Sequence, residues 1–154
     1  MATTFQYRRT SMQLPLLTRS IGSAERSMRA LLEQKLQNAN LSFAGWTVLA
    51  FTSAAPLRSS EVVQRQIAGH VIADVAGGQE SIDSLVHAGL IAKSQDDILT
   101  HSEMGKTVFV RLSGEIEAIT HNLYGDLPIE DLEATHRTLM EITKRAGNLL
   151  THPN

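Results

Sequence analysis

The sequence predicts a single, mainly α-helical domain over residues 1–154, in which a compact central unit is flanked by long helices. Apolar residues recur every three or four positions in residues 14–36 and again in residues 102–150, which is the spacing of one helix face. Between these segments, residues 66–91 read as a helix, a tight turn, a second helix and the start of a strand. The chain has the length of one domain, and its hydrophobic fraction of 42% suffices for a core.

The composition excludes several classes of protein. The chain contains no cysteine, which rules out disulfides, thiol nucleophiles and thiolate metal sites. It has no apolar run of about 18 residues and no apolar leader, so we expect a cytoplasmic protein without membrane contact. The HExxH, Walker, GxGxxG and GxSxG motifs are missing as well, and we expect neither enzyme activity nor a cofactor.

The first helix is expected over residues 14–36. Its apolar seam consists of Leu17, Ile21, Ala24, Met28 and Leu31. Ser42 is placed to cap a second helix over residues 43–54, which must end before Pro56. Residues 57–65 then form a connector with room for a turn or two of helix.

The central unit, residues 66–91, has the features of a helix-turn-helix. Asp74 is placed to cap its second helix, Ile82 supplies part of the apolar face, and Gly89 ends the helix. Gly77 and Gly78 each cost a helix about 0.8–1 kcal/mol relative to alanine, so we expect this helix to begin late or to fray. In proteins with this unit the second helix normally enters the major groove of DNA.

A small β-hairpin is expected next, with strands at residues 90–93 and 98–101. Ser102 can cap a long helix that runs to Tyr124, and Pro128 suits the first turn of a last helix. The predicted fold class is therefore mainly α. It is a winged helix-turn-helix over residues 41–101, with a very short β-hairpin wing between long terminal helices at 14–36 and 102–150.

The apolar seams of the terminal helices exceed what one small chain can cover. Packing against a second copy, most often as a two-fold dimer, buries such seams, and the alternative is an intramolecular bundle. We expect a homodimer. Its dimerisation residues are predicted to be Leu17, Ile21, Met28, Leu132, Leu139, Ile142 and Leu149.

Several segments match, in order, the motifs of one family. Residues 41–49, LSFAGWTVL, are similar to LTxxQWxVL, and residues 66–90 align without a gap with ELAxxLxxxxxxVxRLVxxLExxGL. Residues 102–106, SEMGK, look like the T-x-x-G-[RK] opening of a long helix, and residues 123–127 with the last helix match a C-terminal dimerisation arm. Over about residues 14–150 the chain thus resembles the MarR (multiple antibiotic resistance regulator) family of winged-helix transcriptional regulators.

This resemblance implies a homodimeric transcriptional regulator that binds double-stranded DNA. It also implies a small aromatic effector, held between the dimerisation helices and the DNA-reading unit. Contacts to phosphates are expected from the first turn of the reading helix and from four cations, and contacts to bases from polar side chains. The candidate DNA-binding residues are Val75, Ala76, Gln79, Ser81, Ser84, Arg58, Arg65, Lys93 and Lys106.

The chain departs from the family pattern in charge. No lysine or arginine occurs from Gln66 to Ala92, and Glu80 stands where the family tends to carry arginine. The hairpin is about six residues shorter than usual and its turn is acidic. These departures leave a second interpretation open. The scaffold would no longer read DNA and would act as a protein-interaction or ligand-sensing module, for example by titrating a related regulator.

A metal site is a further alternative. Glu133 and His136 have the Glu-x-x-His spacing, and Glu117 and His121 lie four residues apart. Exposed pairs on helices explain both spacings, and we expect no bound metal.

Overall fold

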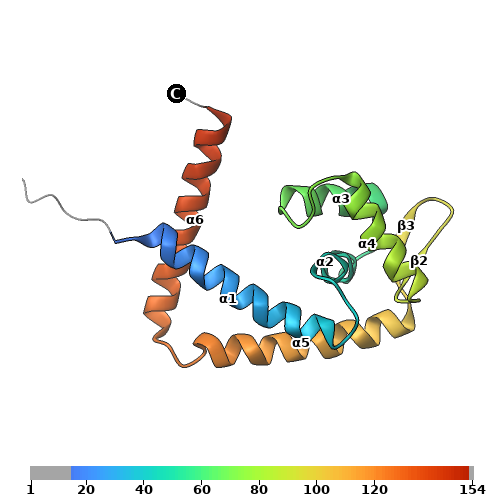
Figure 1. Ribbon diagram of the computed structural model, residues 1–154, viewed down its shortest axis with the longest axis horizontal. Helices are drawn as coiled ribbons and strands as arrows, with labels where there is room; N and C mark the ends of the chain where they lie inside the picture. The colour runs from blue at the N-terminus through green and yellow to red at the C-terminus, as the bar shows by residue number, and fades with distance from the viewer. Residues whose placement is uncertain (1–14, 153–154) are drawn as a thin grey trace, which may run out of the picture.

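The structure is a computed structural model that describes residues 15–152, so the expected first residue of the first helix, Leu14, lies outside the described residues. The described chain forms helices and a small three-stranded sheet (Figure 1). The elements are α1 (Leu17–Gln37), α2 (Phe43–Thr52), β1 (Leu57–Arg58), α3 (Ser59–Ala68), α4 (Val75–His87), β2 (Ile91–Lys93), β3 (Ile98–His101), α5 (Glu103–Tyr124) and α6 (Ile129–Thr151). The predicted fold class is confirmed.

The elements divide into a head and a set of long helices. Helices α2, α3 and α4 pack together with the sheet as a compact head at one end of the molecule (Figure 1). Helices α1 and α5 lie side by side and connect this head to α6, which stands away from it at the other end (Figure 1). The hydrophobic core lies in the head and extends only to one residue each of α1 and α5, Leu36 and Leu112.

Three helix starts follow from capping, as the sequence predicts. The hydroxyls of Ser42 and Ser102 accept hydrogen bonds from the backbone N–H groups three residues on, each at 2.9 Å. The carboxylate of Asp74 accepts from Gly77 N–H at 2.9 Å. Each cap satisfies one of the N–H groups that a helix leaves without a partner in its first turn.

Helix α3 begins earlier than the sequence analysis predicted. It starts at Ser59 rather than near residue 66, and the residues assigned to a connector are strand β1 followed by helix. The side chain of Glu61 accepts from Arg58 N–H at 2.9 Å, which fixes the first turn. The buried face of α3 is formed by Val62, Val63 and Gln66. The turn or two of helix expected in the connector is thus continuous with α3, and the sequence does not show this because Gln66 occupies a core position.

Strand β1 also enlarges the wing. It pairs antiparallel with β3, which pairs antiparallel with β2, so that the strand order is β1-β3-β2. Leu57 lies opposite Leu99, and Ile91 lies opposite His101. The hairpin predicted from residues 90–101 is present, but it is two strands of a three-stranded sheet.

Helix α4 begins at Val75 without delay, so the expected late start is wrong. The reason is packing between α3 and α4. A Cβ atom at Gly78 would lie 2.8 Å from both Ile72 Cδ1 and Val63 Cγ2, too close for any residue but glycine. The close approach of the two helices offsets the conformational cost of this glycine.

Replacing Asp74 with alanine tests the cap of α4. Loss of the bond to Gly77 N–H is expected to lower the free energy of unfolding by about 1 kcal/mol, measured by urea denaturation. Asp74→Asn keeps an acceptor oxygen, so its free energy of unfolding should fall by only a few tenths of the loss in Asp74→Ala. Equal losses for both variants would contradict the capping role.

Candidate nucleic-acid interface

The side of α4 that faces away from the head is here called the reading face. It consists of Val75, Ala76, Gln79, Glu80, Asp83 and Ser84. All of these side chains are exposed except Gln79, which is half-buried, and Val75 is 65% exposed. The face is therefore available to a macromolecule without any rearrangement of the core.

Gln79, the predicted partner of adenine, is engaged with its own helix. Its amide nitrogen donates to Asp83 Oδ1 at 3.0 Å. A two-bond contact to adenine uses both the amide nitrogen and the amide oxygen. The amide nitrogen has two N–H groups, so the bond to Asp83 leaves one donor and the amide oxygen free while it holds the side chain against its own helix.

Ser81, which we expected to offer a donor to DNA, points into the head instead. It is 7% exposed, and its hydroxyl donates to Gly78 O at 2.8 Å and lies 3.4 Å from Gln66 Oε1. Gln66 is fully buried, and its amide nitrogen donates to Ala44 O and Thr47 Oγ1 at 2.9 Å each. This network fixes α4 against α2 and α3, and Ser81 is removed from the predicted contacts.

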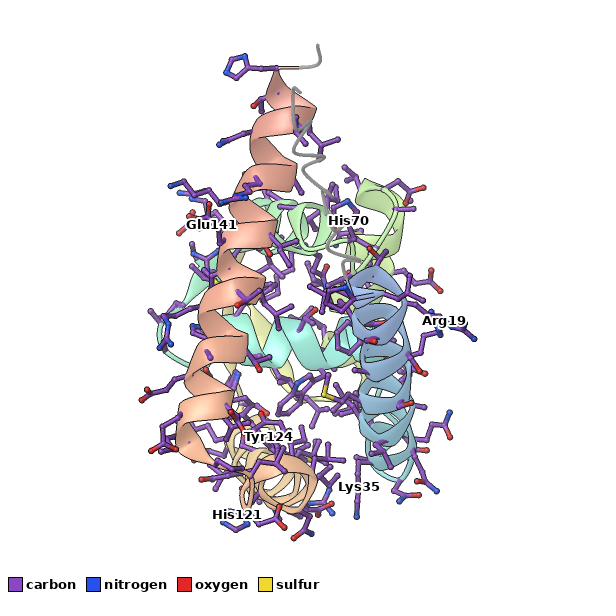
Figure 2. The ribbon with its side chains drawn as sticks, turned by 90° about the vertical axis from the view of Figure 1, so that its left-hand side faces the viewer. Arg19, Lys35, His70, His121, Tyr124 and Glu141 are labelled. Atoms are coloured by element: carbon purple, nitrogen blue, oxygen red, sulfur yellow. The ribbon has the colours of Figure 1, made fainter. Side chains whose placement is uncertain are left out.

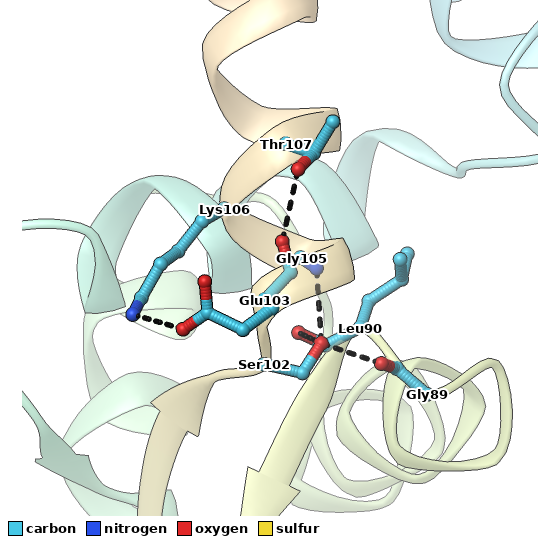
Figure 3. Close-up of polar contacts among 7 residues, drawn as sticks. All are labelled: Gly89, Leu90, Ser102, Glu103, Gly105, Lys106 and Thr107. Carbon is cyan, nitrogen blue, oxygen red and sulfur yellow. Dashed lines mark hydrogen bonds and ion pairs between the residues drawn. The ribbon is translucent and has the colours of Figure 1, made fainter.

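Two of the four cations that are predicted to contact phosphates form ion pairs with carboxylates. Lys93 Nζ lies 2.9 Å from Asp97 Oδ1, and Lys106 Nζ lies 2.6 Å from Glu103 Oε1, as Figure 3 shows for the second pair. The hydrogen bond from Lys106 lowers the pKa of Glu103, and those from Lys93 and then Ser59 lower the pKa of Asp97. The carboxylates thus stay ionised at neutral pH and compete with phosphate for both lysines.

The other two cations form no ion pair within the described residues, although the charge of Arg58 contributes to the lowered pKa of Asp97. Within residues 15–152, neither Arg58 nor Arg65 lies within ion-pair distance of a carboxylate. The guanidinium of Arg58 lies 3.5 Å from Asp96 O, beside the wing turn, and that of Arg65 lies 5.9 Å from the ring centre of Phe51. Both side chains are exposed and can turn towards a phosphate.

The acidic wing turn is partly used within the fold. Ser59 donates through its hydroxyl to Asp97 Oδ1 at 2.9 Å and through its N–H to Asp97 O at 3.1 Å. These bonds connect the wing turn to the start of α3. The sequence does not reveal this role, because the partners lie 38 residues apart. Of the two wing aspartates, only Asp96 remains fully exposed.

The wing and α5 meet at Ser102. Its hydroxyl donates to Gly89 O at 2.6 Å while accepting from Gly105 N–H, so that one side chain joins the end of α4 to the start of α5 (Figure 3). Behind this junction, the ring of Phe109 stacks on Trp46 at 5.3 Å and meets the edge of His101 at 5.5 Å. His101 Nε2 lies 2.9 Å from Leu49 O. These contacts connect α2, α5 and β3.

Helix α6 has an apolar face that the rest of residues 15–152 leaves largely exposed. None of its residues is buried. A groove of about 520 Å³ between α1 and α6, here called the terminal groove, includes Leu17, Ile21, Met28, Leu139 and Ile142 in its lining. Leu132 is half-buried and Leu149 is exposed, both beyond the lining. Figure 2 shows Arg19 and Glu141 pointing outward, away from the space between the two helices.

No helix within residues 15–152 combines the length and the apolar character that a membrane span requires. No three His, Asp or Glu side chains in this range are arranged to hold a metal ion.

The fold and the reading face of α4 together define the class of protein. A helix-turn-helix, α3 and α4, followed by the β2–β3 hairpin is the winged helix-turn-helix arrangement. Neither a protein-family model nor a curated protein sequence matches the chain. Solved structures do, and they have the MarR-type form of this fold.

The reduced form of MarR from E. coli superposes with a TM-score of 0.66 at 17% identity, over 84% of this chain and 95% of that one. Sco5413, a MarR family transcriptional regulator from Streptomyces coelicolor, superposes with a TM-score of 0.67 at 20% identity, over 86% of this chain and 94% of that one. A MarR family transcriptional regulator from Silicibacter pomeroyi superposes with a TM-score of 0.67 at 22% identity, over 84% of this chain and 88% of that one. Each likeness covers at least 84% of this chain, so the chain has the MarR-type winged-helix fold.

Proposed function

We propose that the protein is a homodimeric, DNA-binding transcriptional regulator whose affinity for DNA is modulated by a small aromatic effector. The observation that carries this proposal is the intact helix-turn-helix with its reading face free of intramolecular packing. The likeness to proteins described as transcriptional regulators supports it.

The bare face of α6 supports the homodimer. Within the described chain, α6 buries none of its own side chains, so an intramolecular bundle does not form there. A second copy placed across the terminal groove would cover the apolar seam and would set two heads in two-fold symmetry. Two heads related in this way suit a palindromic DNA site.

DNA contacts in this proposal start from the first turn of α4. Backbone N–H groups at Val75 and Ala76 lie at the positive end of the helix dipole and suit a phosphate. Arg58 and Arg65 add phosphate contacts, and Lys93 and Lys106 do so after leaving their carboxylates. Base contacts come from Gln79 and Ser84, and the methyl groups of Val75 suit a thymine methyl.

The effector is placed between α1 and the head. A small groove of about 200 Å³ there is lined by Met28, Arg29, Leu32 and Phe43 with Glu25. The guanidinium of Arg29 lies 4.3 Å from the centre of the Phe43 ring and 2.7 Å from Glu25 Oε1. An aromatic acid could displace Glu25 from Arg29 while stacking on the ring.

A DNA-binding assay at two salt concentrations tests the proposal. Fluorescence anisotropy of a labelled fragment from upstream of the gene should show specific binding that weakens as salt rises, because phosphate contacts release counterions. An unrelated fragment of equal length is the control. Absence of any retention at low salt would refute the proposal.

A charge reversal at Glu80 gives a sharper prediction. Glu80→Lys replaces an exposed carboxylate on the reading face by a cation. It should tighten binding about tenfold at low salt. The slope of log K against log salt concentration should become steeper by about 0.9 for each new phosphate contact. The same reversal at Glu130, exposed on α6, is the matched control and should change neither quantity. Equal effects of the two would mean that α4 does not face DNA.

A second function is favoured by the acidity of the reading face. Glu80 and Asp83 repel phosphate, and they fit a scaffold that has lost DNA reading and titrates a related regulator through the terminal helices. Mixed dimers with such a regulator would support this function. Self-association with reading helices about 34 Å apart, the spacing of successive major grooves, would oppose it.

A further inference from the structure

The turn between α3 and α4 carries an apolar surface next to the first turn of α4. A groove of about 440 Å³, here called the turn groove, is lined by Ile67, His70, Val71, Ile72 and Ala73. His70, labelled in Figure 2, lies within the turn and adopts a positive φ of 55°. Its N–H donates to Ile67 O at 3.0 Å, and the next N–H donates to Gln66 O at 2.9 Å. The groove is thus part of a hydrogen-bonded turn.

This apolar surface is local. Between Leu41 and His101 three large apolar side chains are exposed, Ile67, Val75 and Val86, and the first two flank this turn. The other exposed apolar side chains lie on α1, α5, α6 and the segments beside them. In the proposed homodimer, a second copy covers the terminal groove between α1 and α6. The turn groove lies in the head, outside that surface.

The exposed charged side chains of α4 and of its N-cap are acidic. Asp74, Glu80 and Asp83 are exposed there, and no lysine or arginine occurs from Gln66 to Ala92, although Arg65 is exposed in the last turn of α3. An apolar groove beside an acidic helix face is a poor match for the phosphate backbone. It matches a helix that has one apolar face and a cationic border.

We propose that the turn groove docks a basic, amphipathic helical segment of another protein. Apolar side chains of this segment fill the groove beside Val75, and its lysines or arginines pair with Glu80 and Asp83. Because Val75 and Glu80 also belong to the reading face, the docked segment excludes DNA from α4. The binding itself does not depend on whether the protein binds DNA.

The test uses synthetic 18-residue peptides and the full-length protein without DNA, at about 150 mM salt, where exposed charges act only over about 8 Å. A fluorescein-labelled helical peptide of leucine and lysine is the probe. Two comparison peptides carry glutamate in place of lysine or serine in place of leucine. Anisotropy should show binding of the leucine–lysine peptide, with at least tenfold weaker binding of the other two.

Matched variants locate the site. Val75→Ser and Ile67→Ser together should weaken binding of the leucine–lysine peptide at least tenfold. Val110→Ser, at a site on α5 that is 69% exposed, should leave this binding unchanged. Glu80→Gln combined with Asp83→Asn should weaken binding of this peptide at least fivefold. Glu130→Gln combined with Asp131→Asn removes the same charge from α6 and should leave the binding unchanged. These are surface positions, and circular dichroism verifies the fold of each variant.

Three results would overturn the proposal. They are no binding of the leucine–lysine peptide, equal binding of the lysine–serine peptide, and binding that the Val75 and Glu80 variants leave unchanged. The last result would place the peptide in the terminal groove or elsewhere. A protein that fails to bind DNA yet binds the peptide at the turn groove would refute the proposed function and leave this inference standing.

Discussion

Replacing Gly105 with alanine is expected to lower the free energy of unfolding by about 2–3 kcal/mol, measured by urea denaturation. The first turn of α5 lies directly on the end of α4, and a Cβ at Gly105 would overlap the carbonyl oxygen of Leu90. Alanine gains about 1 kcal/mol over glycine in a helix, but a clash with backbone outweighs this because the backbone of Leu90 is held by its own hydrogen bonds.

Gly114→Ala is the matched control on the same helix. No atom lies within 4 Å of a Cβ at Gly114, so only the helix propensity remains and the variant should be more stable by about 0.5–1 kcal/mol. Opposite signs for the two substitutions would establish that the junction of α5 with the head depends on contact distance. Two stabilising results would contradict the packing described around Ser102.

Ile142→Glu should convert the proposed homodimer to a monomer and weaken binding to a palindromic DNA fragment by about 100-fold, because the two heads then bind independently. Ile142 lines the terminal groove, and a carboxylate buried against a second copy would have no partner. Analytical ultracentrifugation measures the mass, and anisotropy on a palindromic fragment measures the affinity. The monomer fold should persist, since no residue of α6 is buried.

Thr143→Glu adds the same charge at the next position, which does not line the terminal groove. It should leave both mass and affinity unchanged. If Ile142→Glu remained dimeric, the surface assigned to the second copy would be wrong. If it became monomeric yet bound DNA as tightly as the parent, the proposal of two cooperating heads would fail.

The sequence predicted those features that depend on near neighbours. Ser42, Asp74 and Ser102 cap helices through N–H groups three residues away, and the structure has all three bonds. Gly89 ends α4 with a φ of 72°, as a residue without Cβ can. Helix α5 runs from Glu103 to Tyr124, as expected. Each of these signals is complete within a few residues of sequence.

What the sequence did not predict depends on partners far along the chain. Gln66 looks like a surface residue, yet it bonds Ala44 and Thr47 about twenty residues away, and this concealed the true face of α3. The same network buries Ser81, which the family resemblance implied would contact DNA. The sequence did not reveal the ion pairs of Lys93 and Lys106 for a different reason. Their carboxylates are close in sequence, but their pairing depends on side-chain geometry.

The stacking of Trp46 on Phe109 provides an optical probe that needs no label. Trp46 is the single tryptophan of the chain, and it lies half-buried where α2 meets α5. Its emission therefore reports one location, the joint between the head and the long helices. A shift in its colour or intensity on adding an aromatic acid would register movement at that joint in solution, independently of any DNA measurement.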